Sequence, residues 1–211
     1  MIDAWLQLLT EHKAIAVIRS ERMDLAYNMA HAVSEGGIKL IEITWNSDRP
    51  AQLINRLRAE LPHCTIGVGT ILNLQQLREA VTAGAQFAFA PHFNPDLLNA
   101  CLNHYQIPFV PGVFTPTEMV NAWQQGAKVL KIFPIKSLGG AEYIKCLQGP
   151  LDRIALIPTG GVTVENARTM LDAGAIAVGI SSNLFPKDAI ALQDWLTITI
   201  RTQSLINRLT K

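Results

Sequence analysis

Eight short apolar runs recur along this chain, and each is followed by a turn and a longer amphipathic segment. Each run has the length of a β-strand and is almost continuously apolar, which is the pattern of parallel strands buried on both faces. The runs are Ala14–Arg19, Lys39–Thr44, Thr65–Thr70, Gln86–Pro91, Phe109–Gly112, Lys128–Phe133, Ile154–Thr159 and Ala175–Ile180. The helix-like stretches between them include Met23–Glu35, Leu74–Ala83, Pro116–Gln125 and Val164–Ala173. This alternation predicts an α/β fold with a parallel sheet.

The ends of the expected helices carry local signals of their own. Glycine follows four of them directly, in Glu35-Gly-Gly, Ala83-Gly-Ala, Gln125-Gly-Ala and Ala173-Gly-Ala, where a left-handed residue usually closes a helix before the next strand. Thr115-Pro-Thr-Glu118 has the spacing of a capping box, with proline at the first helical position.

Eight strand–helix units within 211 residues favour a closed (β/α)8 barrel, the TIM-barrel architecture. We expect one domain over residues 1–211, with Met1–His12 as an extra helix before the first strand. A doubly wound open sheet is the structural alternative. It ranks second because the units are evenly spaced and no long insert separates them.

Composition limits the classes of partner. The 18 Lys and Arg residues are scattered and the formal net charge is +1, whereas a nucleic-acid groove needs a concentrated basic face. No stretch is apolar for long enough to span a bilayer, and the amino-terminal residues lack the basic and apolar regions of a signal peptide. We therefore expect a cytoplasmic protein with neither a nucleic-acid nor a membrane partner.

The metal-binding and thiol residues also give a negative expectation. Cys64, Cys101 and Cys146 are odd in number and far apart, which predicts buried or half-buried free thiols in a reducing compartment. The five histidines form no H-x-H or H-x-x-x-H pair, and only His92 falls near a strand end. We expect no metal site and no cofactor.

The sixth apolar run contains a lysine in an unusual place. In a barrel, alternate strand residues point inward, and catalytic groups lie at the carboxyl ends of strands. If Leu130 and Ile132 face the helices, then Lys131 faces the interior together with Val129 and Phe133. Burial disfavours the ammonium form, and an uncharged amine is what Schiff-base chemistry requires. The alternative is the reversed phase, in which Lys131 extends outward to solvent.

Polar residues of the first three strands share this inward phase. In Leu40-Ile-Glu42-Ile-Thr44, Glu42 is a candidate general acid/base, because a carboxylate inside a barrel is costly unless it is used or paired. The alternative for Glu42 is a structural ion pair with Arg19 or Lys131. Arg19 and Thr70 end their strands and are candidates for holding a substrate carboxylate.

The last two units carry a phosphate-site signal. Thr159-Gly160-Gly161 follows the seventh strand, and Ser181-Ser182 follows the eighth. Small residues let backbone N–H groups approach a phosphate, a following helix adds a favourable dipole, and barrels commonly bind phosphate in these two loops.

Taken together, the motifs resemble the class I aldolase family that cleaves 2-keto-3-deoxy-6-phosphogluconate (KDPG) or its galactonate epimer, a family that includes 4-hydroxy-2-oxoglutarate aldolases. The resemblance spans nearly the whole chain. The motifs that carry it are Ala16-Val-Ile-Arg19, Leu40-Ile-Glu42-Ile-Thr44, Gly67-Val-Gly-Thr70-Ile-Leu-Asn73, Ala90-Pro91, Val110-Pro-Gly112, Leu130-Lys131-Ile-Phe133-Pro134, Pro158-Thr159-Gly160-Gly161-Val162 and Gly179-Ile-Ser-Ser182.

The resemblance implies a role for each matching residue. Lys131 matches the Schiff-base lysine and Glu42 the acid/base carboxylate. Arg19 and Thr70 match positions that hold the pyruvate-derived carboxylate and neighbouring groups, and Pro91 matches a proline that lines the pocket. The phosphate site is matched by Thr159, Gly160, Gly161 and Ser182. The implied partner is a phosphorylated keto sugar acid, and the implied assembly is a homotrimer. Apolar side chains such as Trp45, Phe93 and Phe114 are candidates for either a contact between copies or the mouth of the pocket.

Two positions depart from the family pattern. Gluconate-specific members have an arginine four residues after the catalytic glutamate, where this chain has Asn46, whereas the phosphogalactonate type has Asn-Ser there. Asn46 is therefore a candidate substrate-binding residue that bears on the choice of epimer. Ser181 stands where the family usually has glycine before the phosphate serine. The alternatives are an aldolase for unphosphorylated 4-hydroxy-2-oxoglutarate, an isomerase or other phosphate-binding barrel that works without an imine, and a non-catalytic sugar-phosphate-binding barrel.

Overall fold

The computed structural model of the protein describes residues 2–210, and every predicted apolar run contains a strand. All pairings between neighbouring strands are parallel. The strands are β1 (Ala14–Ile18), β2 (Leu40–Thr44), β3 (Thr65–Gly69), β4 (Ala88–Phe89), β5 (Phe109–Val110), β6 (Gly112–Val113), β7 (Val129–Ile132), β8 (Ala155–Pro158) and β9 (Val178–Ile180). The predicted α/β fold with parallel strands is thus confirmed.

The strands are hydrogen-bonded in two sheets, in the orders β5-β4-β3-β2-β1-β9 and β6-β7-β8. Two features connect the sheets. Pro111 alone separates β5 from β6, and it has no N–H with which to continue a ladder. At the other edge, a parallel bridge joins Thr159 after β8 to Gly179 in β9.

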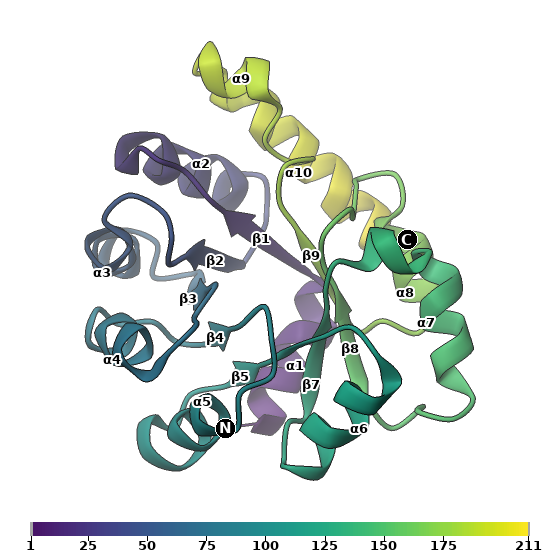
Figure 1. The fold of residues 1–211 in the computed structure, drawn as a ribbon. Helices are drawn as coiled ribbons and strands as arrows, with labels where there is room; N and C mark the ends of the chain where they lie inside the picture. The colour runs from purple at the N-terminus through teal and green to yellow at the C-terminus, as the bar shows by residue number, and fades with distance from the viewer. Residues whose placement is uncertain (1, 211) are drawn as a thin grey trace.

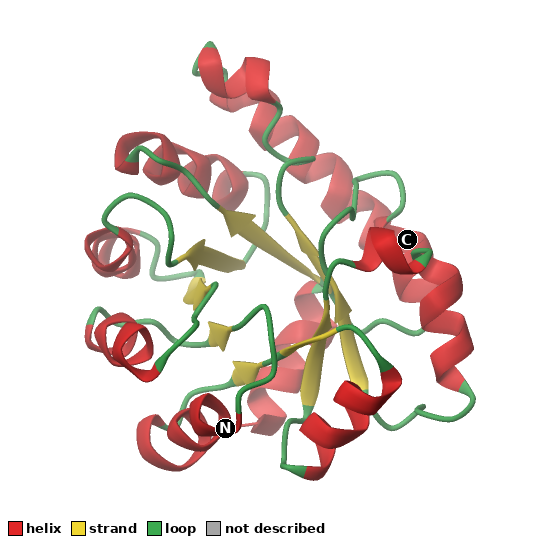
Figure 2. Ribbon diagram, viewed as in Figure 1, coloured by secondary structure: helices red, strands yellow, loops and turns green. Residues whose placement is uncertain are grey.

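The helices surround the strands, except α1, which lies behind the centre of the ring of strands (Figures 1 and 2). They are α1 (Ile2–His12), α2 (Met23–Glu35), α3 (Pro50–Glu60), α4 (Leu74–Thr82), α5 (Pro95–Asn99), α6 (Pro116–Gln124), α7 (Ala141–Gln148), α8 (Ala167–Asp172), α9 (Lys187–Ala191) and α10 (Trp195–Thr210), with a π-helix η1 (Ala100–Tyr105) and a 3-10 helix η2 (Ile135–Leu138). Within the described residues, the extra helix before the first strand is present as α1. The predicted helix ends are also confirmed, since Gly37, Gly84, Gly126 and Gly174 all have positive φ and the Thr115–Glu118 capping box is formed.

Helix α8 begins three residues later than the sequence indicated. The segment from Val164 to Asn166 forms a turn instead of the first helical turn. Side chains explain the difference: Asn166 Oδ1 accepts from the Thr163 N–H at 2.8 Å, and Asn183 Oδ1 accepts from the Val164 N–H at 2.8 Å. Polar side chains that satisfy the backbone locally compete with the helix.

The apolar core has two layers. One layer lies between the strands and the helices and includes Leu130 and Ile132. The other lies among the strands and contains Val129, Phe89 and Ile157. This division confirms the predicted phase of β7, because Val129 and Leu130 fall on opposite faces.

Helix α1 packs at the amino ends of the strands. Its buried Trp5 and Leu9 belong to the same interior cluster as Ile15 and Leu40, which lie at the beginnings of β1 and β2. The Trp5 ring stacks at 4.9 Å from the ring of Phe87, just before β4. The amino end of the strand interior is therefore filled with apolar side chains, and the opposite end remains for polar groups.

Candidate active site

A cavity of about 680 Å³ lies at the carboxyl ends of the strands, and most of the predicted site residues line it. Arg19, Thr70 and Pro91 line it from the ends of β1, β3 and β4, and Lys131 lines it from β7. Thr159, Gly160, Ser181 and Ser182 line it from the loops after β8 and β9. Residues from the ends of several strands thus meet around one cavity, as expected where parallel strands end at the same side of a barrel.

Lys131 points into the interior, as its phase in β7 predicted. Its residue is only 5% exposed, and its strand neighbours are Gly112 in β6 and Ile157 in β8. The Nζ atom lies 5.8 Å from the ring centroid of Phe89 and 5.1 Å from that of Phe133. No carboxylate among residues 2–210 lies within 4.0 Å of the amine. The amine therefore sits in an aromatic pocket that opens to the cavity.

Glu42 is buried beside this amine with one oxygen unpartnered. It is 1% exposed, and within residues 2–210 its Oε1 atom has no hydrogen-bond partner and no cation within 4.0 Å. Burial raises the pKa of Glu42 above its usual value, and the nearby charges of Lys131 and Arg19 oppose this rise. The structural ion pair considered for Glu42 is not formed in this structure. A carboxyl with a raised pKa and a free oxygen is suited to proton transfer.

Gly69 provides the space that the Glu42 carboxyl occupies. A Cβ atom placed on Gly69 would lie 1.6 Å from Glu42 Oε1, which no real contact permits. Thr44 pairs in register with Gly69, so the Glu42 side chain leans toward the carboxyl end of the sheet. The glycine in the third strand is thus explained by the carboxylate of the second.

Arg19 and Thr70 form a polar pair on one side of the cavity. The Arg19 Nη2 atom donates to Thr70 Oγ1 at 3.3 Å. Thr70 adopts a φ of +59°, a left-handed conformation that is strained for a β-branched residue. This residue directly follows β3 and lines the cavity.

The loops after β8 and β9 approach each other closely. A Cβ on Gly179 would lie 2.4 Å from Thr159 Oγ1, so the bridge between these residues requires glycine. Gly160 has a φ of +82°, which glycine adopts without strain. Ser181 Oγ donates to the Val17 carbonyl at 2.8 Å, which ties the second loop to the end of β1. Residues of both loops, Thr159 and Gly160 after β8 and Ser181 and Ser182 after β9, therefore line one cavity.

Three predicted features fall outside the cavity lining. Asn46 is exposed in the turn after β2. Gly161, with a φ of +99°, lies against the Lys136 side chain. Helix α8 begins at Ala167 and not directly after the glycines, so a phosphate in this cavity would meet loop N–H groups and not the start of α8.

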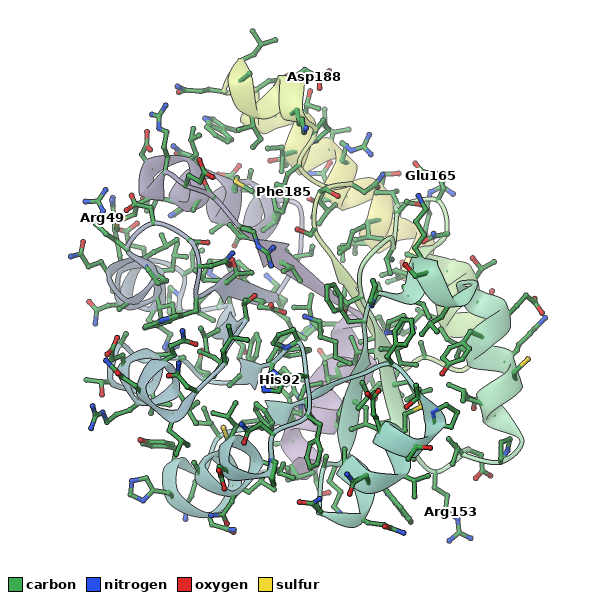
Figure 3. The ribbon with its side chains drawn as sticks, viewed as in Figure 1. Arg49, His92, Arg153, Glu165, Phe185 and Asp188 are labelled. Atoms are coloured by element: carbon green, nitrogen blue, oxygen red, sulfur yellow. The ribbon has the colours of Figure 1, made fainter. Side chains whose placement is uncertain are left out.

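Residues that sequence reasoning missed form one wall of the cavity. Met29 lines it from α2, and Phe185, Lys187 and Ile190 line it from the segment that enters α9. In Figure 3, Phe185 lies on the side of the site nearest to α2. The signal in the sequence was the direct succession from Ser181-Ser182 to Phe185-Pro-Lys187.

The remaining expectations concern thiols, metals and membranes. All three cysteines are free; Cys64 and Cys101 are buried, but Cys146 is exposed on α7, where its side chain faces away from the core, contrary to the expectation of burial. Among residues 2–210, no three His, Cys, Asp or Glu side chains lie together in a metal-binding group. His92 is exposed in the loop after β4 (Figure 3). No helix in that range is both long and apolar enough to cross a membrane.

Comparison with known proteins gives consistent matches. The family model described as "KDPG and KHG aldolase" matches residues 6–200. A 2-dehydro-3-deoxy-phosphogluconate aldolase of Dickeya dadantii is 33% identical over 193 residues, covering 92% of this chain and 90% of the relative. The KDPG aldolase of Legionella pneumophila, solved with pyruvate as a covalent carbinolamine intermediate, superposes with a TM-score of 0.87 at 28% identity, covering 95% and 97% of the two chains. A native KDPGal structure gives a TM-score of 0.84 at 30% identity, covering 93% and 94%.

Proposed function

This chain belongs to the KDPG and KHG aldolase family, and from that premise we propose that Lys131 forms the Schiff base of its reaction. Membership of the family makes the chain an aldolase, a carbon–carbon lyase. The observation that carries the proposal is the position of Lys131, a buried amine without an ion-pair partner in residues 2–210 that opens to the cavity.

The covalent steps of the reaction take place on the Lys131 amine. Uncharged Lys131 attacks the C2 keto carbon of a 2-keto-3-deoxy-6-phospho sugar acid, and the carbinolamine loses water to give a protonated imine. The imine accepts the electron pair of the C3–C4 bond when that bond breaks, which leaves an enamine on the lysine. Protonation of the enamine at C3 and hydrolysis of the imine then release pyruvate.

Glu42 is assigned the proton transfers. Cleavage of C3–C4 requires removal of the proton from the C4 hydroxyl, and Glu42 accepts it directly or through a water molecule. Glyceraldehyde 3-phosphate leaves as the aldehyde product. The assignment rests on the Oε1 atom, which has no hydrogen-bond partner among residues 2–210, and on the pKa of Glu42, which burial raises above that of an exposed glutamate.

The other predicted residues orient the substrate. Arg19 and Thr70 are assigned to the keto acid end, and Pro91 to contact with the reacting carbons. Asn46, which lies outside the cavity lining, is assigned to the choice between the two epimers. Thr159, Gly160, Gly161, Ser181 and Ser182 are assigned to the phosphate. Binding the remote phosphate positions the C3–C4 bond and contributes to the rate of its cleavage.

Borohydride reduction in the presence of pyruvate tests the assignment of Lys131. We expect a stable adduct on the wild-type protein that peptide mass analysis places on Lys131. Lys131→Met should give no adduct, whereas Lys128→Met, which removes an exposed lysine from the same segment, should give the wild-type adduct. An adduct that persists in Lys131→Met would rule out the assignment.

The substrate is decided by comparing kcat/KM for the gluconate epimer, the galactonate epimer and 4-hydroxy-2-oxoglutarate. The proposal predicts pyruvate release from a phosphorylated epimer at a higher kcat/KM than from 4-hydroxy-2-oxoglutarate. A higher value for the unphosphorylated compound would make the chain a hydroxyoxoglutarate aldolase instead. Binding of the phosphorylated acids without pyruvate release would identify a non-catalytic binding barrel.

The proposal includes a fold in which the described residues form one closed (β/α)8 barrel. Two observations support closure: β5 and β6 are separated by Pro111 alone, and Thr159 bridges to Gly179 at the other edge. Counting β5 and β6 as one barrel strand, the chain supplies eight.

We also propose a homotrimer in the cytoplasm. Phe114 and Trp123 are each 39% exposed and are candidates for a contact between copies, whereas Trp45 and Phe93 pack against the core. Light scattering should give three times the chain mass of 23.2 kDa. The cytoplasmic location is supported by the three free cysteines.

A further inference from the structure

We propose that Lys187 supplies the positive charge of the phosphate subsite and thereby sets the preference of this enzyme for phosphorylated over unphosphorylated keto acids. This inference rests on the proposed function and assigns a residue that neither the sequence motifs nor the matching loops include.

Lys187 lies beside the residues proposed to bind the phosphate. It lines the same cavity as Thr159, Gly160, Ser181 and Ser182. It also opens helix α9, only five residues after Ser182. The loop that contains Ser181 and Ser182 thus leads directly into the lysine.

The other cations of the cavity already have a partner or a proposed role. Arg19 and Lys131 also line it, but Arg19 donates to Thr70 after β3, and Lys131 is committed to the imine. Thr159, Gly160, Ser181 and Ser182 are all uncharged. A phosphate that carries nearly two negative charges would therefore meet only neutral donors in these loops unless Lys187 approaches it.

The Lys187 amine is available to bind an anion. Among residues 2–210, no carboxylate lies within 4.0 Å of its amine. The adjacent Asp188 lies at the outer tip of α9, at the edge of the molecule (Figure 3). This exposed ammonium, on a long flexible stem and unpaired within the described residues, can reach an anion in the cavity.

Apolar side chains line the cavity close to the lysine. Met29, Phe185 and Ile190 line the cavity on the same side. They limit the water around an ion pair formed there, and a lower local dielectric strengthens the attraction between the charges. None of these three side chains has an N–H or O–H donor, so they offer no hydrogen bond to an unphosphorylated substrate.

The test is titration with glycerol 3-phosphate, which contains the phosphate but has no keto group for Lys131. Calorimetry on the full chain should show that Lys187→Met weakens binding about three- to tenfold, the range expected for a partly exposed charged contact. Lys187→Arg should retain most of the affinity. Added NaCl should weaken the binding of glycerol 3-phosphate more steeply in the wild type than in Lys187→Met, because salt screens the attraction of the Lys187 ammonium, which the variant lacks.

Two matched variants make the result specific. Lys128→Met removes one charge at the amino end of β7, away from the cavity, and should bind as the wild type does. Lys136→Met tests the rival cation, whose side chain lies against Gly161. Wild-type affinity in Lys187→Met, a loss confined to Lys136→Met, or no measurable binding by the wild type would each overturn the proposal.

Turnover then links the charge to selectivity. In Lys187→Met, the ratio of kcat/KM for the phosphorylated acid to that for 4-hydroxy-2-oxoglutarate should fall about three- to tenfold. An unchanged ratio contradicts the proposal. The binding test does not depend on chemistry at Lys131, so failure of borohydride trapping would overturn the proposed function and leave the titration to decide the role of Lys187.

Discussion

Gly69 and Glu42 act as a pair at the residue scale, because one has no side chain where the other needs room. Gly69→Ala should lower kcat strongly and reduce the free energy of unfolding by about 1–3 kcal/mol, since the new methyl group displaces the Glu42 carboxyl. Gly149→Ala is the control, because Gly149 has a φ of −68° and nothing lies within 4 Å of a Cβ built there. Urea unfolding and pyruvate release measure both effects. Equal effects in the two variants would show that the space beside Glu42 is not required.

Glu42 should also set the acid limb of the pH profile. Burial raises its pKa above the usual 4.5, so the neutral acid is favoured in the folded protein and the carboxylate base is lost on acidification sooner than an exposed glutamate would be. We expect kcat/KM to fall as pH decreases through that raised value. Glu42→Gln should lower kcat about 10²- to 10⁴-fold and remove this limb. If Glu42→Gln keeps the limb, another group controls it.

At the scale of elements, helix α10 is connected to the loops after β8 and β9, which we propose bind the phosphate. Arg201 Nε donates to the Asn183 carbonyl at 3.0 Å, and Asn183 Oδ1 accepts from the Val164 N–H at 2.8 Å. One helix, the loop after β9 and the loop after β8 are therefore connected through two side chains. Arg201 does not line the cavity, so we expect it to act on substrate binding only by positioning these loops.

Removal of this connection should affect binding more than chemistry. Arg201→Met should raise KM for the phosphorylated acid about three- to tenfold with little change in kcat, because hydrogen bonds from a charged donor contribute about 1.5–3 kcal/mol and part of that loss reaches the loops. Arg208→Met, on an exposed face of the same helix, should leave KM unchanged. Steady-state kinetics decides, and a fall in kcat without a rise in KM would argue against a positioning role.

At the scale of the whole molecule, stability and chemistry lie at opposite ends of the strands. Leu9 of α1 is fully buried at the amino ends, whereas the cavity lies at the carboxyl ends. Leu9→Ala should therefore lower the free energy of unfolding by about 2–5 kcal/mol and leave kcat/KM almost unchanged below the melting temperature. Leu192→Ala, at an 80% exposed position, should change neither quantity. A large loss of kcat/KM in Leu9→Ala would show that the two ends are coupled.

Most of the strands and several helices could be predicted because their signals are local. Apolar runs such as Val129–Ile132 report burial on both faces, and the glycine that ends α4 and the capping box that begins α6 are short-range motifs. The start of α8 could not be predicted, because Asn183, which holds Val164 in a turn, comes from the next unit of the chain.

The sequence by itself determined the order of strands and helices, the inward phase of Lys131 and Glu42, and the loops after β8 and β9 as one side of the site. These follow from periodicity and from residue type, which neighbouring residues decide. Only the tertiary structure decided that Glu42 has an oxygen against Gly69 with no partner in residues 2–210, that Asn46 lies outside the cavity, and that Lys187 lines it. The physical reason is that these properties depend on distances between segments far apart in the chain, and packing alone sets those distances.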